Sequence, residues 1–403
     1  MRGFILVGEW PVDGFDVHAI AWRPTPLSQF VLKMHARCNL ACDYCYMYEA
    51  VDQSWRDSPR QMSAETLRRT GERIAQHARR HQLDKVQVIF HGGEPLLAGA
   101  STLARSATTL RAAMPEGTAV AFSVQTNGTL LDETALAELA RENIRIAVSL
   151  DGDQATHDRH RQRPGGARSH AATVRALRLL CSGKHRPLFA GLLTVVDLTA
   201  DPVGVYESLL EFTPPQVDFL LPHANWSAPP LRQGSPYNRE YGEWLARAFD
   251  RWYGAPRQET CVRLFREIIH LLLGGASETE QIGLSAAAMI VVNTDGGLEQ
   301  VDALRTAYAG AVQTALTVFD NDMDDALRHP AIVARQIGLA ALADSCQRCP
   351  VRRVCGGGHY AHRYRRGSGF RNPSVYCRDL QYLIRHVGDR LRQDLTTLRD
   401  ANP

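Results

Sequence analysis

The sequence predicts an α/β fold in which six parallel strands and their connecting helices form an open, partial (β/α)6 TIM barrel. From Gln29 onward, short β-rich runs alternate with stretches of helical periodicity, a pattern typical of βαβ units and a parallel sheet. Six such units are fewer than the eight that close a full barrel. Because the carboxyl ends of parallel strands face one side, we expect the chemistry in a shared cleft there.

The elements of the barrel follow one another in the first half of the chain. The six predicted strands are Phe30–His35, Lys85–Phe90, Ala119–Gln125, Ile144–Leu150, Leu188–Val196 and Val217–Leu221. Helical patterns fill the connections, for example Ala64–Arg80 after a candidate N-cap at Ser63, and Thr173–Cys181. The alternation predicts a barrel over residues 28–225, preceded by an extension, 1–27, whose role the pattern does not reveal.

The alternation ends after Leu221. A proline-rich connection leads into two predicted helices, Tyr237–Tyr253 and Val262–Leu273, which form a helical linker over 226–285. Ala286–Val292, followed by the turn Asp295-Gly296-Gly297, predicts a hairpin. The last segment, 286–403, has little periodicity before a final helix over Asp379–Leu398. It is rich in Cys, Gly and Arg, which indicates a small module organised by metal.

Composition and charge exclude several classes of protein. Hydrophobic residues make up 44% of the 403 residues and charged residues 22%, as in ordinary globular chains. The net charge is only +3, which gives no sign of a nucleic-acid or membrane-surface partner. No apolar run reaches the roughly 18 residues of a membrane span, and no signal-peptide pattern begins the chain. We expect a soluble, cytoplasmic protein.

The nine cysteines fall into two groups near the two ends of the chain. An odd number without a signal peptide argues for metal, cluster or catalytic thiolates rather than disulfides. Cys38, Cys42 and Cys45 form a C-x3-C-x2-C loop after the first strand. Three thiolates suit a [4Fe–4S] cluster that keeps one iron open, whereas a structural zinc site normally has four ligands. A zinc knuckle or chance spacing is the alternative.

The three-cysteine loop resembles the signature of the radical SAM superfamily. That resemblance implies that the open iron binds S-adenosylmethionine (SAM), which is cleaved to a 5′-deoxyadenosyl radical. The second strand ends in His91-Gly92-Gly93-Glu94-Pro95, which resembles the family's GGEP motif. There Gly92 and Gly93 would permit a close backbone approach, and Glu94 would bind the amino group of the cofactor.

The resemblance implies further cofactor contacts at the other strand ends. Segments ending the third and fourth strands resemble those that line the ribose and methionine portions of SAM, and Arg161 fits the position that binds the cofactor carboxylate. An aromatic residue between the second and third cysteines usually lies beside adenine. These expected contacts are Tyr44, Gln125, Asn127, Ser149, Asp151 and Arg161. The alternatives are a solvated charge run around Arg161 and ordinary packing of Tyr44.

The second cysteine group is Cys346, Cys349, Cys355 and Cys377. By the number of ligands alone, either a zinc ion or a [4Fe–4S] cluster is possible. The group resembles part of the SPASM domain of peptide-modifying radical SAM enzymes, which has seven cysteines and two auxiliary clusters. His359 and Val301 stand where two of the other cysteines would be. The resemblance therefore implies one auxiliary [4Fe–4S] cluster and the loss of its companion.

Asp302, next to Val301, is the candidate catalytic residue. Anaerobic sulfatase-maturating enzymes share the SPASM pattern, and an aspartate at this motif position is their proposed catalytic base. The resemblance implies the same role for Asp302. The alternative is a surface aspartate on a hairpin.

Longer phrases resemble the FxsB-type radical SAM/SPASM maturases. They are 29–33, 42–46, 52–56, 356–364 and 370–377. The resemblance implies a ribosomally made precursor peptide as substrate, a flavodoxin- or ferredoxin-type electron donor, and a C–C crosslink (cyclophane) between an aromatic ring and a nearby Cβ. The alternatives are thioether formation, oxidation without a crosslink, epimerisation with Cys261 as hydrogen donor, or a non-enzymatic iron–sulfur or zinc protein.

Overall fold

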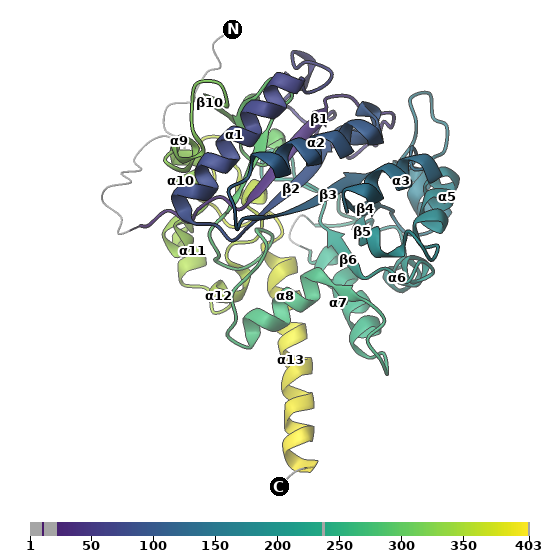
Figure 1. Cartoon of the computed structure of the whole chain (residues 1–403). Helices are drawn as coiled ribbons and strands as arrows, with labels where there is room; N and C mark the ends of the chain where they lie inside the picture. Colours follow the sequence, from purple (N-terminus) through teal and green to yellow (C-terminus); the bar gives the residue numbers. More distant parts are fainter. Residues whose placement is uncertain (1–9, 12–21, 236–237, 402–403) are drawn as a thin grey trace.

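Ten strands among the described residues form one sheet, in the order β10-β9-β8-β1-β2-β3-β4-β5-β6-β7, and Figure 1 shows how its central strands run through the molecule. The structure is a computed structural model that describes residues 10–11, 22–235 and 238–401. The strands are β1 (Gln29–His35), β2 (Lys85–Gly92), β3 (Ala119–Thr126), β4 (Arg145–Ser149), β5 (Phe189–Val195), β6 (Gln216–Leu220), β7 (Cys261–Val262), β8 (Met289–Val292), β9 (Gly297–Glu299) and β10 (Gln313–Thr317).

Strands β1 to β6 are parallel neighbours in chain order, which confirms the predicted partial barrel. The side chains on the face of these strands that meets the helices, such as Phe30, Val88 and Phe90, are fully buried. The helices between them are α1 (Ala64–His81), α2 (Ala100–Ala113), α3 (Glu133–Arg141), α4 (Gln154–His160), α5 (His170–Leu180) and α6 (Pro202–Leu210). In Figure 1, α1, α2 and α3 cover one face of the strands.

The predicted cap of the first helix is present. The Ser63 hydroxyl accepts a hydrogen bond from the Thr66 N–H at 3.0 Å, which satisfies one of the amides left free at a helix start. Strand and helix bounds otherwise differ from the predicted ones by a few residues, because hydrogen bonding at the ends of elements is weakly specified by periodicity.

The C-terminal part of the chain extends the sheet of the barrel. Strand β8 pairs in parallel with β1, and β9 returns antiparallel to β8, as the hairpin prediction required. The remaining helices are α7 (Glu240–Tyr253), α8 (Arg263–Leu272), α9 (Met323–Leu327), α10 (Pro330–Val333), α11 (Asp344–Gln347), α12 (Arg352–Cys355) and α13 (Cys377–Ala401). Helix α13 packs beside α7, where Arg232 pairs with Asp379 at 2.6 Å, and its far end projects from the body (Figure 1).

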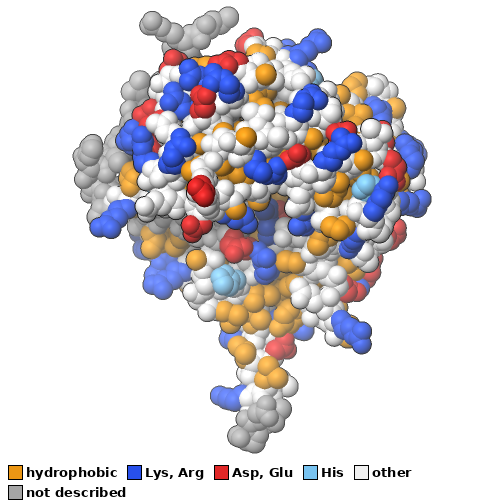
Figure 2. Space-filling view, viewed as in Figure 1, with side chains coloured by type: hydrophobic (Ala, Val, Ile, Leu, Met, Phe, Trp, Pro, Cys, Tyr) orange, Lys and Arg blue, Asp and Glu red, His pale blue; other side chains and the backbone are white. Residues whose placement is uncertain are grey.

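The predicted extension, 1–27, lies mostly outside the described residues. Its last residue, Leu27, is fully buried in the main core, and the Leu27 N–H donates to His77 Nε2 at 3.0 Å. Charges of both signs are interspersed on the face shown in Figure 2. Within the described ranges, no helix has the length and apolar character of a membrane span.

Candidate active site

The three-cysteine loop lies at the carboxyl end of β1, between that strand and α1. Two backbone hydrogen bonds hold it against the end of α4 and the residues that follow, from the Ala41 N–H to Gln162 O at 2.7 Å and from the Asp43 N–H to His160 O at 3.3 Å. Burial raises the pKa of the Cys38 thiol to about 12, and the nearby Cys42 and Cys45 contribute. Half-buried thiols this close together need positive charge to ionise. A [4Fe–4S] cluster would supply that charge, so the donor set fits it.

Gly92 and Gly93 pack directly on the backbone that precedes the first cysteine. A Cβ at Gly92 would collide with the His35 carbonyl oxygen, and one at Gly93 would collide with the Arg37 carbonyl and the Tyr48 hydroxyl. Gly92 also has a φ of +133°, which other residues rarely adopt. These positions therefore require glycine, and their packing brings the end of β2 against the cysteine loop.

Glu94 is fully buried at the end of β2. Its carboxylate accepts hydrogen bonds from the Leu96 N–H at 3.0 Å, the Thr126 hydroxyl at 2.8 Å and the Asn127 N–H at 2.9 Å. Burial raises the pKa of Glu94 to about 6, although these hydrogen bonds favour the carboxylate. A buried carboxylate so close to the cysteine loop is suited to receive an ammonium group.

The ends of β3 and β4 face the same loop. Asn127 donates through Nδ2 to Asn39 Oδ1 at 2.9 Å and contacts Cys38 Sγ at 3.7 Å. Gln125 Nε2 donates to the Ser149 hydroxyl at 3.1 Å. The structure therefore brings these predicted contact residues to the cleft of the three-cysteine loop.

Tyr44, Asp151 and Arg161 form one group beside the loop, in which Asp151 and Arg161 are buried and Tyr44 is half-buried. The Tyr44 hydroxyl and Arg161 Nε both donate to Asp151 Oδ2, the latter at 2.8 Å. The Arg161 guanidinium lies 5.5 Å from the centre of the Tyr44 ring. Burial opposes ionisation of Asp151, but Arg161 lowers its pKa overall. The solvated charge run considered for this segment is wrong for Arg161, which is 9% exposed.

Asp302 begins the 3-10 helix η5 (Asp302–Thr306), just after β9, and is buried. The surface location considered for it is therefore wrong. Its Oδ1 lies 2.6 Å from Lys33 Nζ and 3.2 Å from Arg305 Nε. Burial opposes ionisation, but Lys33 and Arg305 outweigh it and lower the pKa of Asp302. The group is thus held as a carboxylate.

The partners of Asp302 were not found from the sequence. Glu299 joins the network, because its Oε2 lies 2.6 Å from Lys33 Nζ and 3.0 Å from Arg305 Nη2. One signal was available: Lys33 stands in the middle of an otherwise apolar strand, where an unpaired lysine would be costly.

The negative charge of Asp302 also acts on residues beside the three-cysteine loop. Burial raises the pKa of Tyr46, which follows Cys45, and the negative charge of Asp302 adds to that shift. The same charge acts on His91, just before the Gly92-Gly93 turn. The contact of Asp302 with Lys33, which pairs with His91 in the sheet, places Asp302 on the face of β1 and β2 that carries these two residues.

The four cysteines of the second group converge at the base of α13. Gln381 Nε2 contacts Cys349 Sγ at 3.5 Å and Cys377 Sγ at 3.6 Å. Burial raises the pKa of the Cys355 thiol to about 12, and the adjacent Cys377 and Cys346 contribute. Four converging thiols fit a fully ligated [4Fe–4S] cluster.

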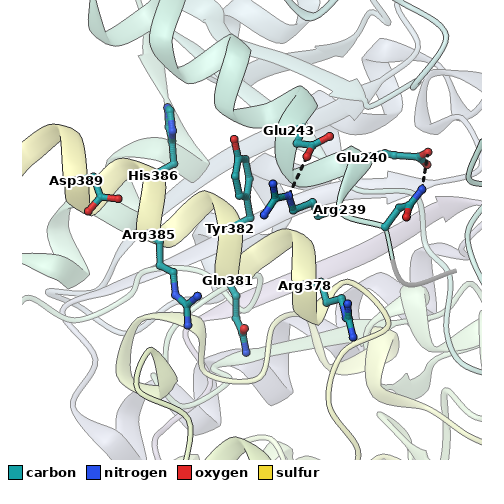
Figure 3. Close-up of a pocket in the computed structure, with 10 residues that line it drawn as sticks. Arg239, Glu240, Glu243, Arg378, Gln381, Tyr382, Arg385, His386 and Asp389 are labelled. Carbon is teal, nitrogen blue, oxygen red and sulfur yellow. Dashed lines mark hydrogen bonds and ion pairs between the residues drawn. The ribbon is translucent and has the colours of Figure 1, made fainter. Parts of the chain in front are cut away.

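A surface cavity of about 950 Å³ lies beside this second group, between α7 and α13 (Figure 3). Its walls are mixed in charge, with Arg239 paired to Glu243 at 2.8 Å. Gln381, which contacts two of the cysteines, is one of its lining residues. The cavity contains none of the predicted SAM contacts, so we assign it to the surroundings of the second group and not to the active-site cleft.

Cys181 and Cys261, which lie outside both cysteine groups, are half-buried. Cys261 pairs with Gln216 at the amino end of β6. The cleft lies at the opposite, carboxyl ends of the strands, so this position does not support the alternative of Cys261 as the hydrogen donor of an epimerase.

This geometry matches what is expected of a radical SAM active site. A sequence model of the radical SAM superfamily matches residues 32–201, which run from β1 to the start of α6 and contain the three-cysteine loop. The match indicates SAM and a [4Fe–4S] cluster as cofactors, and the second cysteine group fits an auxiliary cluster.

Similar proteins extend over most of the chain. The cysteine-type anaerobic sulfatase-maturating enzyme of Clostridium perfringens is 25% identical over 380 residues, which cover 91% of this chain and 97% of that enzyme. The serine-type enzyme of Klebsiella aerogenes is 26% identical over 355 residues, covering 84% of this chain and 81% of that enzyme.

Two solved structures share the fold. Native anSMEcpe with bound AdoMet and Cp18Cys peptide superposes with a TM-score of 0.79 at 22% identity, covering 93% of this chain and all of that one. Streptococcus suis SuiB bound to precursor peptide SuiA gives a TM-score of 0.57 at 14% identity, with coverages of 87% and 76%.

Proposed function

We propose that this radical SAM enzyme modifies a ribosomally made precursor peptide by forming a C–C crosslink between an aromatic ring and a nearby Cβ. The observation that carries the proposal is the buried, ionised Asp302, whose charge acts on Tyr46 and His91 beside the three-cysteine loop. A crosslinking reaction needs such a base, because the ring must lose a proton to regain aromaticity.

When bound, SAM and its cluster supply a 5′-deoxyadenosyl radical that removes one hydrogen atom from the peptide. Cys38, Cys42 and Cys45 would hold the cluster, and Glu94 and Arg161 would bind the amino and carboxylate groups of SAM. Tyr44, Gln125, Asn127, Ser149 and Asp151 would line the rest of the cofactor, and Gly92 and Gly93 would allow its close approach.

After the carbon radical adds to the ring, one proton and one electron remain to be removed. The Asp302 carboxylate would accept the proton at Oδ1 or Oδ2. Cys346, Cys349, Cys355 and Cys377 would hold one auxiliary [4Fe–4S] cluster, which offers an acceptor for the electron. A flavodoxin- or ferredoxin-type protein would supply the electron that starts each turnover.

Several similarities support a peptide or protein as substrate. The structure of anSMEcpe contains a Cp18Cys peptide, and that of SuiB contains precursor peptide SuiA. The resemblance to FxsB-type maturases in 356–364 and 370–377 supports the crosslink in particular, and 370–377 includes the cluster ligand Cys377.

Oxidation of a cysteine or serine side chain is the second candidate, because the curated relatives are cysteine- and serine-type sulfatase-maturating enzymes. That reaction also removes a hydrogen atom, a proton and an electron. Asp302 and the auxiliary cluster would serve it equally well, so the two candidates differ only in the peptide product.

The test is to incubate the reduced holoenzyme and SAM with peptides encoded beside its gene and to sequence the products by mass spectrometry. A crosslink removes two hydrogens and suppresses backbone fragmentation between the joined residues. Oxidation of serine to an aldehyde also removes two hydrogens, but it leaves fragmentation intact and lets a hydrazide probe label the product. A hydrazide-reactive, uncrosslinked product would contradict the crosslink.

A further inference from the structure

Three histidines come together at the mouth of the barrel, outside both cysteine groups. His223 follows the carboxyl end of β6, while His359 and His362 lie at the start and inside of the 3-10 helix η7 (Tyr360–Arg363). One ring nitrogen of each lies within 4.8 Å of the others. The three ring centres are 5.0 to 5.5 Å apart. We refer to these residues as the histidine triad.

The nitrogens of the triad are poorly satisfied by the protein. His223 Nδ1 and His362 Nε2 are buried and have no hydrogen-bond partner among the described residues. His359 Nδ1 accepts a long hydrogen bond of 3.3 Å from the Ala361 N–H. Because buried polar atoms in native proteins normally have a partner, these unpaired nitrogens indicate a ligand. His362 is only 4% exposed.

A second histidine group in the structure shows what a satisfied cluster looks like. His77, His81 and Asp324 also lie within 4.8 Å of one another. There, however, His77 Nδ1 contacts Asp324 at 2.6 Å, and His77 Nε2 accepts from the Leu27 N–H. Hydrogen bonds account for both nitrogens of His77, so that group requires no ion.

The surroundings keep the triad uncharged. Burial lowers the pKa of His223 and of His359 to about 3, and neutral imidazole is the form that binds metal. Arg335 and Arg363 add positive charge nearby. Arg335 is paired with Glu280, and Arg363 donates to the carbonyl oxygens of the 356–358 glycine turn. The guanidinium groups of Arg335 and Arg363 therefore already have oxygen acceptors.

The triad also faces the active site. The Tyr46 ring, which follows Cys45 in the three-cysteine loop, lies 4.9 Å from the His223 ring in an edge-to-face arrangement. His362 packs against Tyr376, the neighbour of Cys377, with ring centres 4.9 Å apart. The triad therefore lies between residues that adjoin the two cysteine groups.

We propose that His223, His359 and His362 bind one divalent transition-metal ion of the zinc type, separate from both iron–sulfur clusters. Imidazole nitrogen suits such ions, and three protein ligands leave one position open for water or a substrate oxygen. Tetrahedral Zn–N bonds of about 2.0–2.1 Å place nitrogens roughly 3.3 Å apart, which small ring rotations at these histidines would reach. The proposal goes beyond the proposed function, which uses no third metal.

The test uses the wild-type holoenzyme with both iron–sulfur clusters reconstituted, to which zinc is added before dialysis. We expect about one tightly bound zinc ion per chain. X-ray absorption at the zinc edge should show nitrogen or oxygen neighbours at about 2.0–2.1 Å from the zinc. Sulfur neighbours at about 2.3 Å would place the zinc in a cysteine site and overturn the proposal. No zinc above the level of a buffer blank would overturn it too.

Variants locate the ion. His359→Ala and His223→Gln should each weaken zinc binding at least about tenfold, since loss of even an outer partner costs 10–100-fold, with iron content unchanged. His81→Ala, in the satisfied cluster, is the matched control and should bind zinc as the wild type does. Zinc retained in both triad variants, or lost only in the control, would overturn the assignment. The wild-type spectrum decides the question even if a variant fails to fold.

Discussion

Lys33 Nζ lies 2.6 Å from Asp302 Oδ1, and both side chains are buried. The contact joins β1 to the start of η5, just after β9. It therefore places the candidate base beside the loop that begins a few residues after Lys33. Removing one partner of a buried ion pair typically costs about 3–5 kcal/mol, because the other charge is left buried and unpaired. This contact therefore positions Asp302, and loss of either partner should destabilise the segment after β9.

Lys33→Met should raise the pKa of Asp302, because burial then opposes ionisation with only Arg305 and His91 nearby. In the wild type the lowered pKa keeps Asp302 ionised down to a lower pH than an ordinary aspartate. In the variant the carboxylate would be protonated as the pH falls through a higher value. The acid limb of the pH profile of product formation should move upward. Lys33→Arg keeps the positive charge and should shift the acid limb less. Identical pH profiles for the wild type, Lys33→Met and Lys33→Arg would show that Lys33 does not control the ionisation of Asp302.

Asp302→Asn should bind SAM and peptide and still form 5′-deoxyadenosine, because hydrogen abstraction precedes proton loss. The modified peptide should fall by about tenfold or more, within the range of about 10²–10⁴-fold that general acid–base groups contribute. The measurement is the ratio of deoxyadenosine to product. Asp295→Asn is the control, since this exposed residue of the same hairpin keeps the oxygen that accepts from the Gly297 N–H. If Asp302→Asn leaves the ratio of deoxyadenosine to modified peptide unchanged, Asp302 is not the base.

SAM binding should weaken in acid if Glu94 receives the cofactor ammonium group. The pKa of Glu94 is raised to about 6, so its carboxylate is protonated as the pH falls through that value. The Kd should rise about tenfold between pH 7 and pH 5. Glu94→Gln should bind SAM weakly at both values and lose most of this dependence. A wild-type Kd that stays constant over this range would contradict the assignment.

Changing Cys38, Cys42 and Cys45 together to Ala should halve the iron content, from about eight to about four per chain, as expected for loss of one of two [4Fe–4S] clusters. With dithionite as reductant, the variant should form no 5′-deoxyadenosine above background. Continued cleavage of SAM would show that the radical cluster is held elsewhere.

Cys377→Ala should remove the auxiliary cluster and leave cleavage of SAM intact. Soluble yield should fall as well, because the four thiols organise a segment with few regular elements and metal binding is coupled to folding. The matched control is Cys181→Ala, whose half-buried thiol lies at the end of α5; it should keep all the iron. Full iron content in Cys377→Ala would contradict the ligand assignment.

Local patterns in the sequence were sufficient for the barrel and for both cysteine groups. The six strands follow from hydrophobic periodicity, which is a property of neighbouring residues. Cys38, Cys42 and Cys45 lie in one short loop, so their spacing alone constrains what they can ligate. The strand-end positions of Glu94 and Asp151 were likewise predictable, because parallel strands bring their carboxyl ends to one side.

Only the tertiary structure decided the surroundings of Asp302 and the histidine triad. Lys33 and Glu299 are 266 residues apart in the chain, and their contact depends on β8 pairing with the outer edge of β1. His223 meets His359 because the end of β6 faces the C-terminal module. No periodicity or spacing encodes such contacts. They arise from the path of the whole chain, which is set by burying the apolar faces of distant segments together.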